Sequence, residues 1–155
     1  MKNKTSITYG IVIAIALCAY FWILNGLLGL SSAAFSFVNC LIMGAGIWFA
    51  IKKKKKEQAG LFKYGDGFTT GLVTGFIATT IFTIFFGIYA GEINPDFLDE
   101  FLTMWRSDYE ISIPIVLFTV FAMGAATTFA LTLAFMQLFK KSWNTTEAEK
   151  HKLSN

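Results

Sequence analysis

The polar groups that could do chemistry lie mostly outside the long apolar runs of this chain. His151, the single histidine, stands in a polar tail where no nucleophile, base and orienting group can be assembled around it. The segment Gly65-Asp66-Gly67 lacks the lysine and serine of a phosphate-binding loop and precedes an apolar run instead of following a strand. The sequence therefore predicts a protein that is not an enzyme and that has no catalytic, cofactor or metal residues.

The apolar runs themselves contain no Asp, Glu, Lys, Arg or His, whereas proton relays and ion-coupled carriers place ionisable groups within the membrane. Asn25 and Asn39 are the polar side chains that invite attention there, because counting from the ends of their runs puts them at equal depth. We interpret them as a hydrogen-bonded pair between two helices. The alternative is a polar pocket for a ligand head group. Cys18 and Cys40 also lie in these runs, and we interpret both as packing residues.

The elements that must position these residues are membrane-spanning helices. Of the 155 residues, 55% are hydrophobic and only 15% are charged. A helix rising about 1.5 Å per residue needs about 20 residues to cross the hydrocarbon of a bilayer. The sequence predicts an all-α integral membrane protein, a single domain of four transmembrane helices in an antiparallel bundle. The predicted spans are 11–30, 33–51, 68–90 and 113–139.

The first two runs are separated only by Ser31 and Ser32, which predicts a tight helical hairpin. A rival interpretation takes the first run as a cleaved signal peptide, with Ser32-Ala33-Ala34 as the cleavage site. The apolar part of a signal peptide is usually shorter than this run, and another apolar run follows at once. We therefore expect the first run to be a span.

Lysines indicate which side of the membrane each end faces. They occur near the N-terminus, at the start of the tail 140–155, and as a block within the connection 52–67. Lysines in short loops remain on the cytoplasmic side, so we expect both termini on the cytoplasmic side of the membrane. The block could also hold anionic head groups, or serve only as a topology signal in a solvated linker. The candidate lipid-contact residues are Lys52, Lys53, Lys54, Lys55 and Lys56.

The connection 91–112 has the opposite character, with six acidic residues and Arg106 as its single basic residue. Asn94 and Pro95 form a good helix start. Phe97, Phe101 and Trp105 then recur at four-residue spacing, which predicts a short amphipathic interfacial helix in this outer loop. Its apolar face could lie on the bilayer or on the bundle, and it is the candidate surface for a partner protein.

Small residues mark a helix contact between the third and fourth runs. Gly71 and Gly75 are four residues apart, as are Gly124 and Thr128. Small side chains let helix backbones approach closely in lipid. We expect the third and fourth spans to pack there. The alternative is a homodimer contact through the same glycines.

Several segments together resemble the bacterial domain-of-unknown-function family 4199. They are the lysine block, a helix containing Gly71, and the segments Tyr64-Gly65-Asp66-Gly67-Phe68 and Ile93-Asn94-Pro95-Asp96-Phe97. The resemblance implies a similar length and span count and supplies no catalytic residue. It also implies an accessory role beside a membrane-associated glycosyltransferase of the envelope.

We therefore expect a scaffold or accessory subunit of an envelope complex, with membrane lipids and another membrane protein as partners. Nucleic acid is not an expected partner. The alternative is a small transporter or lipid-handling protein with a polar pathway in the bundle.

Overall fold

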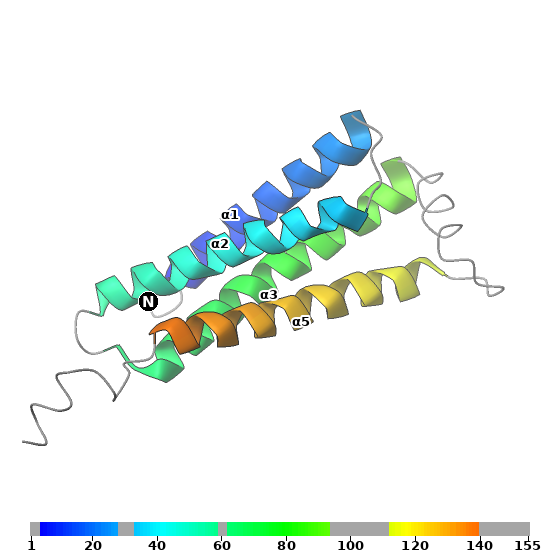
Figure 1. The fold of residues 1–155 in the computed structure, drawn as a ribbon. Helices are drawn as coiled ribbons and strands as arrows, with labels where there is room; N and C mark the ends of the chain where they lie inside the picture. Colours follow the sequence, from blue (N-terminus) through cyan, green and yellow to red (C-terminus); the bar gives the residue numbers. More distant parts are fainter. Residues whose placement is uncertain (1–3, 28–32, 59–61, 94–111, 140–155) are drawn as a thin grey trace, which may run out of the picture.

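The computed structural model describes residues 4–27, 33–58, 62–93 and 112–139, and the side chains of 26, 27 and 33–36 are not among those described. Within these residues the regular structure is all helical (Figure 1). The elements in chain order are α1 (Lys4–Phe21), the π-helical turn η1 (Trp22–Leu27), α2 (Ala33–Glu57), α3 (Tyr64–Ile88), the π-helical turn η2 (Tyr89–Ile93) and α5 (Ile113–Phe139).

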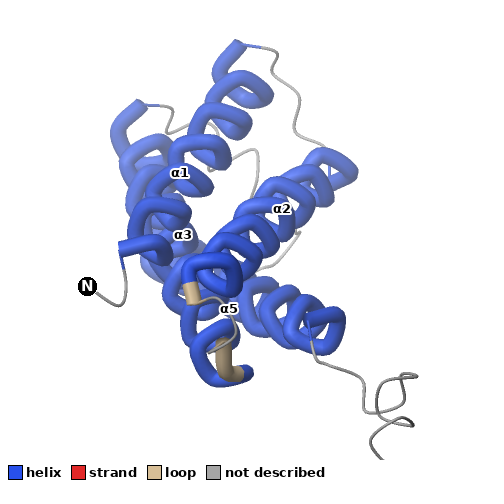
Figure 2. Tube along the Cα trace, turned by 90° about the vertical axis from the view of Figure 1, so that its left-hand side faces the viewer, coloured by secondary structure: helices blue, strands red, loops and turns tan. Residues whose placement is uncertain are grey.

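The four helices form an antiparallel bundle with α3 at its centre (Figures 1 and 2). The contacts of α3 with α1 and with α5 are the most extensive, and α3 also packs along α2. The hairpin partners α1 and α2 pack on each other, whereas α2 meets α5 over a shorter stretch. The bundle is therefore held together mainly by what each helix contributes to its contact with α3.

The helix α2 continues through the lysine block to Glu57, although the sequence places these lysines in an inner loop that runs to Gly67. Lysine is a good helix former, and positive side chains are favoured at a helix C-terminus by the macrodipole. The next helix begins at Tyr64, where the Asp66 amide donates to the Lys63 carbonyl at 3.0 Å. The connection between α2 and α3 is therefore much shorter than predicted, and charge at this end of α2 does not interrupt the helix.

The fourth predicted run and the helix α5 have the same bounds, Ile113–Phe139. Pro114 occupies the first turn, where its missing amide hydrogen has no partner to lose. The amide of Ile115 donates to the Ser112 carbonyl at 3.0 Å, which closes that turn. The local sequence at this end thus explains where the helix starts.

Among the described residues, three helical stretches are long and apolar enough to cross a membrane: Lys4–Asn25, Tyr64–Ile93 and Ile113–Phe139. Their outward faces carry large apolar side chains, among them Ile15, Phe118 and Leu138, which are 63%, 72% and 70% exposed. Apolar surface of this extent needs a lipid or protein cover. By helix length and hydropathy the chain is a multi-pass membrane protein. The predicted interfacial helix and the tail 140–155 lie outside the described residues.

Two apolar clusters fill the interior. The larger lies among all four helices in the half of the bundle that holds the lysine block, and it is built on Ile13, Leu17, Met43, Ile47, Ile51, Ala78 and Met136. The smaller lies near η2 and includes Phe21, Phe86, Tyr89 and Val116. Phe21 of α1 is surrounded there by rings of α3 and η2 in edge-to-face contact, with centroid distances of 5.1 Å to Tyr89 and 5.5 Å to Phe86. This aromatic cluster joins α1 to α3 at the end opposite the lysines.

Candidate functional site

The contact between α3 and α5 is an interlocking set of glycines and threonines, which we call the Gly/Thr interface. A Cβ atom placed on Gly71 or Gly75 of α3 would lie closer than 3.0 Å to a threonine of α5, and one placed on Gly124 of α5 would meet a threonine of α3 equally closely. The three pairs are Gly71 with Thr132, Gly75 with Thr128, and Gly124 with Thr79. The two backbones therefore approach as closely as these residue types allow.

The sequence analysis placed Gly71, Gly75, Gly124 and Thr128 on packing faces, and the structure brings all four together at this interface. It did not single out Thr132 or the extension of the same row at Gly67, which lies against Met136. The overlooked signal was the unbroken four-residue recurrence on both helices. Because residues four apart share a helix face, the recurrence defines one continuous stripe on each helix.

The hydroxyl groups at this interface are not equivalent. The Oγ1 of Thr128 donates to the carbonyl of Gly124 at 2.9 Å and lies 3.8 Å from Sδ of Met43 on α2. The Oγ1 atoms of Thr74, Thr79 and Thr132 are buried without a hydrogen-bond partner. Unpaired buried hydroxyls cost stability, so these three positions are polar groups within a tightly packed interior.

Two further glycines let α1 approach its neighbours. A Cβ on Gly10 of α1 would lie 2.8 Å from Ile77 of α3. A Cβ on Gly46 of α2 would overlap the side chain of Ile13 of α1. Small residues therefore lie at the α3–α5, α1–α3 and α1–α2 contacts, and the sequence analysis had assigned only the first of these.

The asparagines of the candidate polar pair have separate environments. The amide nitrogen of Asn25 donates to the Phe21 carbonyl at 3.2 Å within its own helical turn. The Oδ1 of Asn39 is buried and has no hydrogen-bond partner. The predicted hydrogen bond between the two side-chain amides is therefore not accepted by Asn39 Oδ1, and pairing of the two residues stays a prediction.

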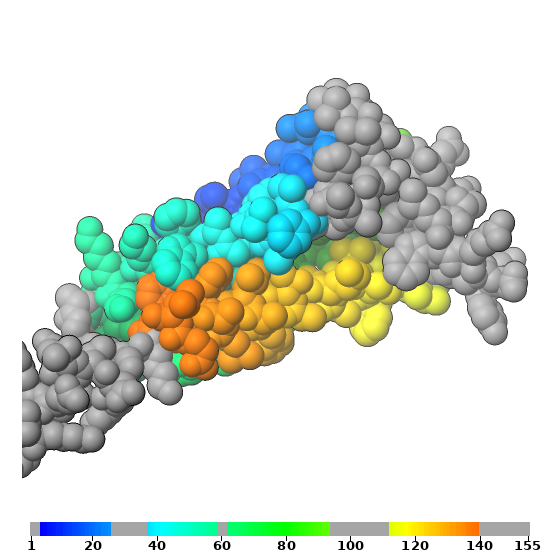
Figure 3. All heavy atoms as spheres, in the orientation of Figure 1, coloured from blue at the N-terminus to red at the C-terminus, as the bar shows by residue number. Residues whose placement is uncertain are grey.

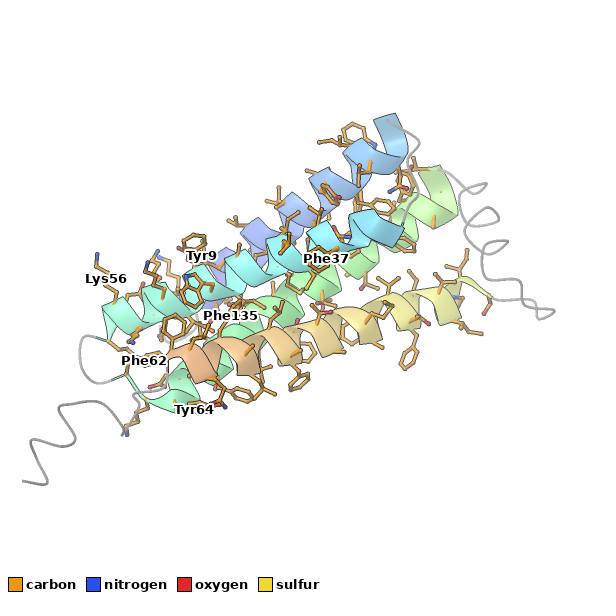
Figure 4. All side chains as sticks on the ribbon, in the orientation of Figure 1. Tyr9, Phe37, Lys56, Phe62, Tyr64 and Phe135 are labelled. Carbon is orange, nitrogen blue, oxygen red and sulfur yellow. The ribbon has the colours of Figure 1, made fainter. Side chains whose placement is uncertain are left out.

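The lysine block forms the last turns of α2, and two of its lysines lie over aromatic rings of the flanking helices. Nζ of Lys53 lies 5.6 Å from the centre of the Tyr9 ring of α1, and Nζ of Lys55 lies 5.2 Å from the Phe139 ring of α5. Lysine over an aromatic face is an attractive arrangement. Lys54 is half-buried, whereas Lys52 and Lys56 are exposed. Figure 4 shows Lys56 extending away from the other helices.

Hydrogen bonds tie the same end of the bundle together. The hydroxyl of Thr5 donates to both carboxylate oxygens of Glu57, at 3.0 and 3.2 Å, which links the start of α1 to the end of α2. The side-chain amide of Gln58 donates to Asp66 at 3.3 Å and links α2 to α3. The exposed lysines thus project from an end that is fixed by contacts among three helices.

The candidate partner surface, Phe97, Phe101 and Trp105, lies outside the described residues. Among the residues the structure does describe, no group of three or more His, Cys, Asp or Glu side chains is placed to hold a metal ion.

The helices and their packing define the class as an all-helical multi-pass membrane protein whose helices associate through small residues. A family model described as "Protein of unknown function (DUF4199)" matches residues 8–111. The chain therefore belongs to this family, and the matched residues include α2, α3 and most of α1, with α5 beyond them. No curated protein and no solved structure matches the chain.

Proposed function

We propose that the chain is a non-enzymatic scaffold or accessory subunit that acts through its surfaces on another membrane protein of the envelope. The observation that carries the proposal is the Gly/Thr interface, where glycines and threonines of α3 and α5 are in direct contact along the bundle. Because these packed side chains fill the space between the two helices, we expect the protein to act through the outer surface of the bundle. One such surface is formed by the exposed lysines at the end of α2. The other, expected from the sequence alone, is the segment holding Phe97, Phe101 and Trp105.

The orientation we propose places the lysine block and both termini on the cytoplasmic side of the bacterial inner membrane. This orientation is supported by the rule that short connections rich in lysine stay on the cytoplasmic side of the membrane. The acidic connection 91–112 then faces outward. A glycosyltransferase of the envelope is one partner that fits an accessory role, and a second copy of the chain is another.

The test is affinity purification from native membranes in mild detergent, with mass spectrometry of proteins that are recovered in fixed ratio. A stoichiometric membrane protein supports the accessory role, and its activity is then compared with and without this chain. A variant with Phe97, Phe101 and Trp105 changed to serine should lose that partner. Recovery of the chain alone, under several detergents and after crosslinking in the membrane, would contradict the proposal.

The second candidate is a small transporter or lipid-handling protein. The observation that favours it is the set of buried polar atoms without partners, Asn39 Oδ1 and the hydroxyls of Thr74, Thr79 and Thr132. Such atoms could accept or donate to a polar solute in a different conformation of the bundle. Purified protein that moves a solute or lipid across liposomes, with loss of the flux in Asn39→Leu or Thr79→Val, would favour this candidate over the scaffold.

A further inference from the structure

Near the lysine block, α2 is covered by other helices on some of its sides. One side packs on α1, the opposite side packs on α5, and the side between them lies on α3. These contacts are made by residues spaced around the helix, and one side of α2 is covered by none of the other described helices. The contacts are Gly46 with Ile13 of α1, Gly44 with Leu131 of α5, and Ile51 with Gly71 of α3.

The uncovered side, which we call the open face of α2, is a stripe of residues at three- and four-residue spacing. Its members are all exposed, and Leu41 and Phe49 are 56% and 55% exposed. Residues at this spacing share one face of a helix. The stripe consists of Leu41, Ala45, Phe49, Lys52 and Lys56, and Figure 3 shows the surface of α2 between α1 and α5.

Along the open face, apolar side chains are followed by positively charged ones, which matches the acyl chain and the phosphate of a phospholipid. Two large apolar side chains flank the small Ala45, and together they offer an exposed apolar surface to a hydrocarbon chain. Directly after Phe49 come two lysines four residues apart, with Cβ atoms about 6 Å from each other. Both ammonium groups can therefore reach one phosphate at the depth where the apolar surface ends.

The other lysines of the block differ in position. Lys53 and Lys55 are turned toward the rings of Tyr9 and Phe139 on the flanking helices. Lys52 and Lys56 alone continue the apolar stripe of the open face. Four of the five lysines thus form two pairs, one against the neighbouring helices and one on the open face, and Lys54 is half-buried.

We propose that the open face of α2 binds an anionic phospholipid, with an acyl chain along Leu41, Ala45 and Phe49 and the phosphate between Lys52 and Lys56. The charge of the pair is complementary to the phosphate, and the apolar stripe that leads into it favours a lipid over free phosphate. The inference rests on the membrane placement within the proposed function and does not depend on any protein partner.

The experiment is a titration of the purified full chain with phosphatidylglycerol or phosphatidylcholine of identical acyl chains, followed by native mass spectrometry. Two double variants remove the same charge: Lys52→Gln with Lys56→Gln, and Lys53→Gln with Lys55→Gln. Since each lysine near the head groups strengthens anionic lipid binding about fivefold, the first variant should bind phosphatidylglycerol at least about tenfold more weakly. The second should keep the preference of the parent chain for phosphatidylglycerol over phosphatidylcholine.

Equal losses in the two double variants would overturn the proposal, because they would indicate a response to net charge alone. Retention of the preference by the Lys52 and Lys56 variant would overturn it as well. Displacement of phosphatidylglycerol by millimolar inorganic phosphate would also overturn the proposal, because it would indicate a phosphate site to which the acyl chain does not contribute. The thermal unfolding midpoint is measured for each variant, and the single variant Lys56→Gln replaces any double variant that unfolds. Because only the purified chain and lipid are present, failure here is separate from failure to recover a protein partner.

Discussion

Gly75 of α3 lies so close to Thr128 of α5 that a single added methyl group would overlap the threonine side chain. Thr128 is fully buried, and its hydroxyl is held by the Gly124 carbonyl one turn earlier. The methyl group of the threonine therefore has no free direction in which to move. This pair fixes both the distance and the relative height of the two helices.

Gly75→Ala should destabilise the bundle, because the added Cβ must push α3 and α5 apart. Overpacking of this kind costs about 1–3 kcal/mol. The matched control is Gly65→Ala in the first turn of the same helix, where nothing lies within 4 Å of an added Cβ. That control should be neutral or slightly stabilising, since alanine favours helix over glycine by about 0.5–1 kcal/mol. Thermal unfolding in detergent measures both, and equal midpoints for the two variants would contradict this packing.

The hydroxyl groups of Thr128 and Thr132 should respond differently to removal. Thr132→Val deletes a buried hydroxyl without a hydrogen-bond partner, so the free energy of unfolding should stay the same or rise by up to about 1 kcal/mol. Thr128→Val deletes the bond to the Gly124 carbonyl within α5 and should lower the free energy of unfolding by about 0.5–1.5 kcal/mol. Valine keeps the shape of threonine, so each variant controls for packing in the other. A larger loss at Thr132 would indicate that its hydroxyl has a partner in the membrane.

Phe21→Leu should weaken the attachment of α1 to α3. Phe21 makes edge-to-face contacts with rings of α3 and η2, and such pairs contribute about 0.5–1.5 kcal/mol each beyond burial. We expect a loss of about 1–3 kcal/mol in the free energy of unfolding. Phe118→Leu, at a position that is 72% exposed, should change it little. A comparable loss at Phe118 would place that ring against a further helix or a second copy of the chain.

The proposed orientation predicts opposite accessibility of the two ends of the bundle. In a chain with Cys18 and Cys40 replaced by alanine, Lys56→Cys should react with a membrane-impermeant maleimide only after the cytoplasmic side is opened. Ser112→Cys should react in intact cells, because it precedes α5 at the other end. Both positions are exposed in the structure, so labelling reports the side and not burial. The reverse pattern would invert the proposed topology.

The four long helices among the described residues and the α3–α5 contact were predictable from the sequence because both depend on short-range patterns. Apolar runs of span length predict helices, and small residues four apart predict where backbones meet. The course of α2 through its lysines was not predicted, because a change from apolar to charged residues marks the edge of a membrane span and not the end of a helix. Lysine has a high helix propensity, so the two boundaries differ.

The side on which a residue lies was harder to predict than its depth. Counting residues predicts that Asn25 and Asn39 lie at the same height, but a hydrogen bond also requires both side chains to point toward each other, so their pairing stays a prediction. The Phe21 cluster was overlooked for a related reason, since the 17 phenylalanines of the chain show no spacing that distinguishes this one. Only the packed bundle separates rings that face lipid from rings that face a neighbour.

The central position of α3 has a consequence for how the protein is made. During synthesis α1 and α2 are made before α3. The close-approach surface at Gly10 therefore has no partner until Ile77 of α3 has been translated. Within the described residues, α1 and α5 make no extensive contact with each other. Insertion of α3 therefore supplies the surface on which the last helix, α5, docks. A fault in α3 should leave chains in which α1 and α2 can still pack on each other but α5 has no helix to dock on.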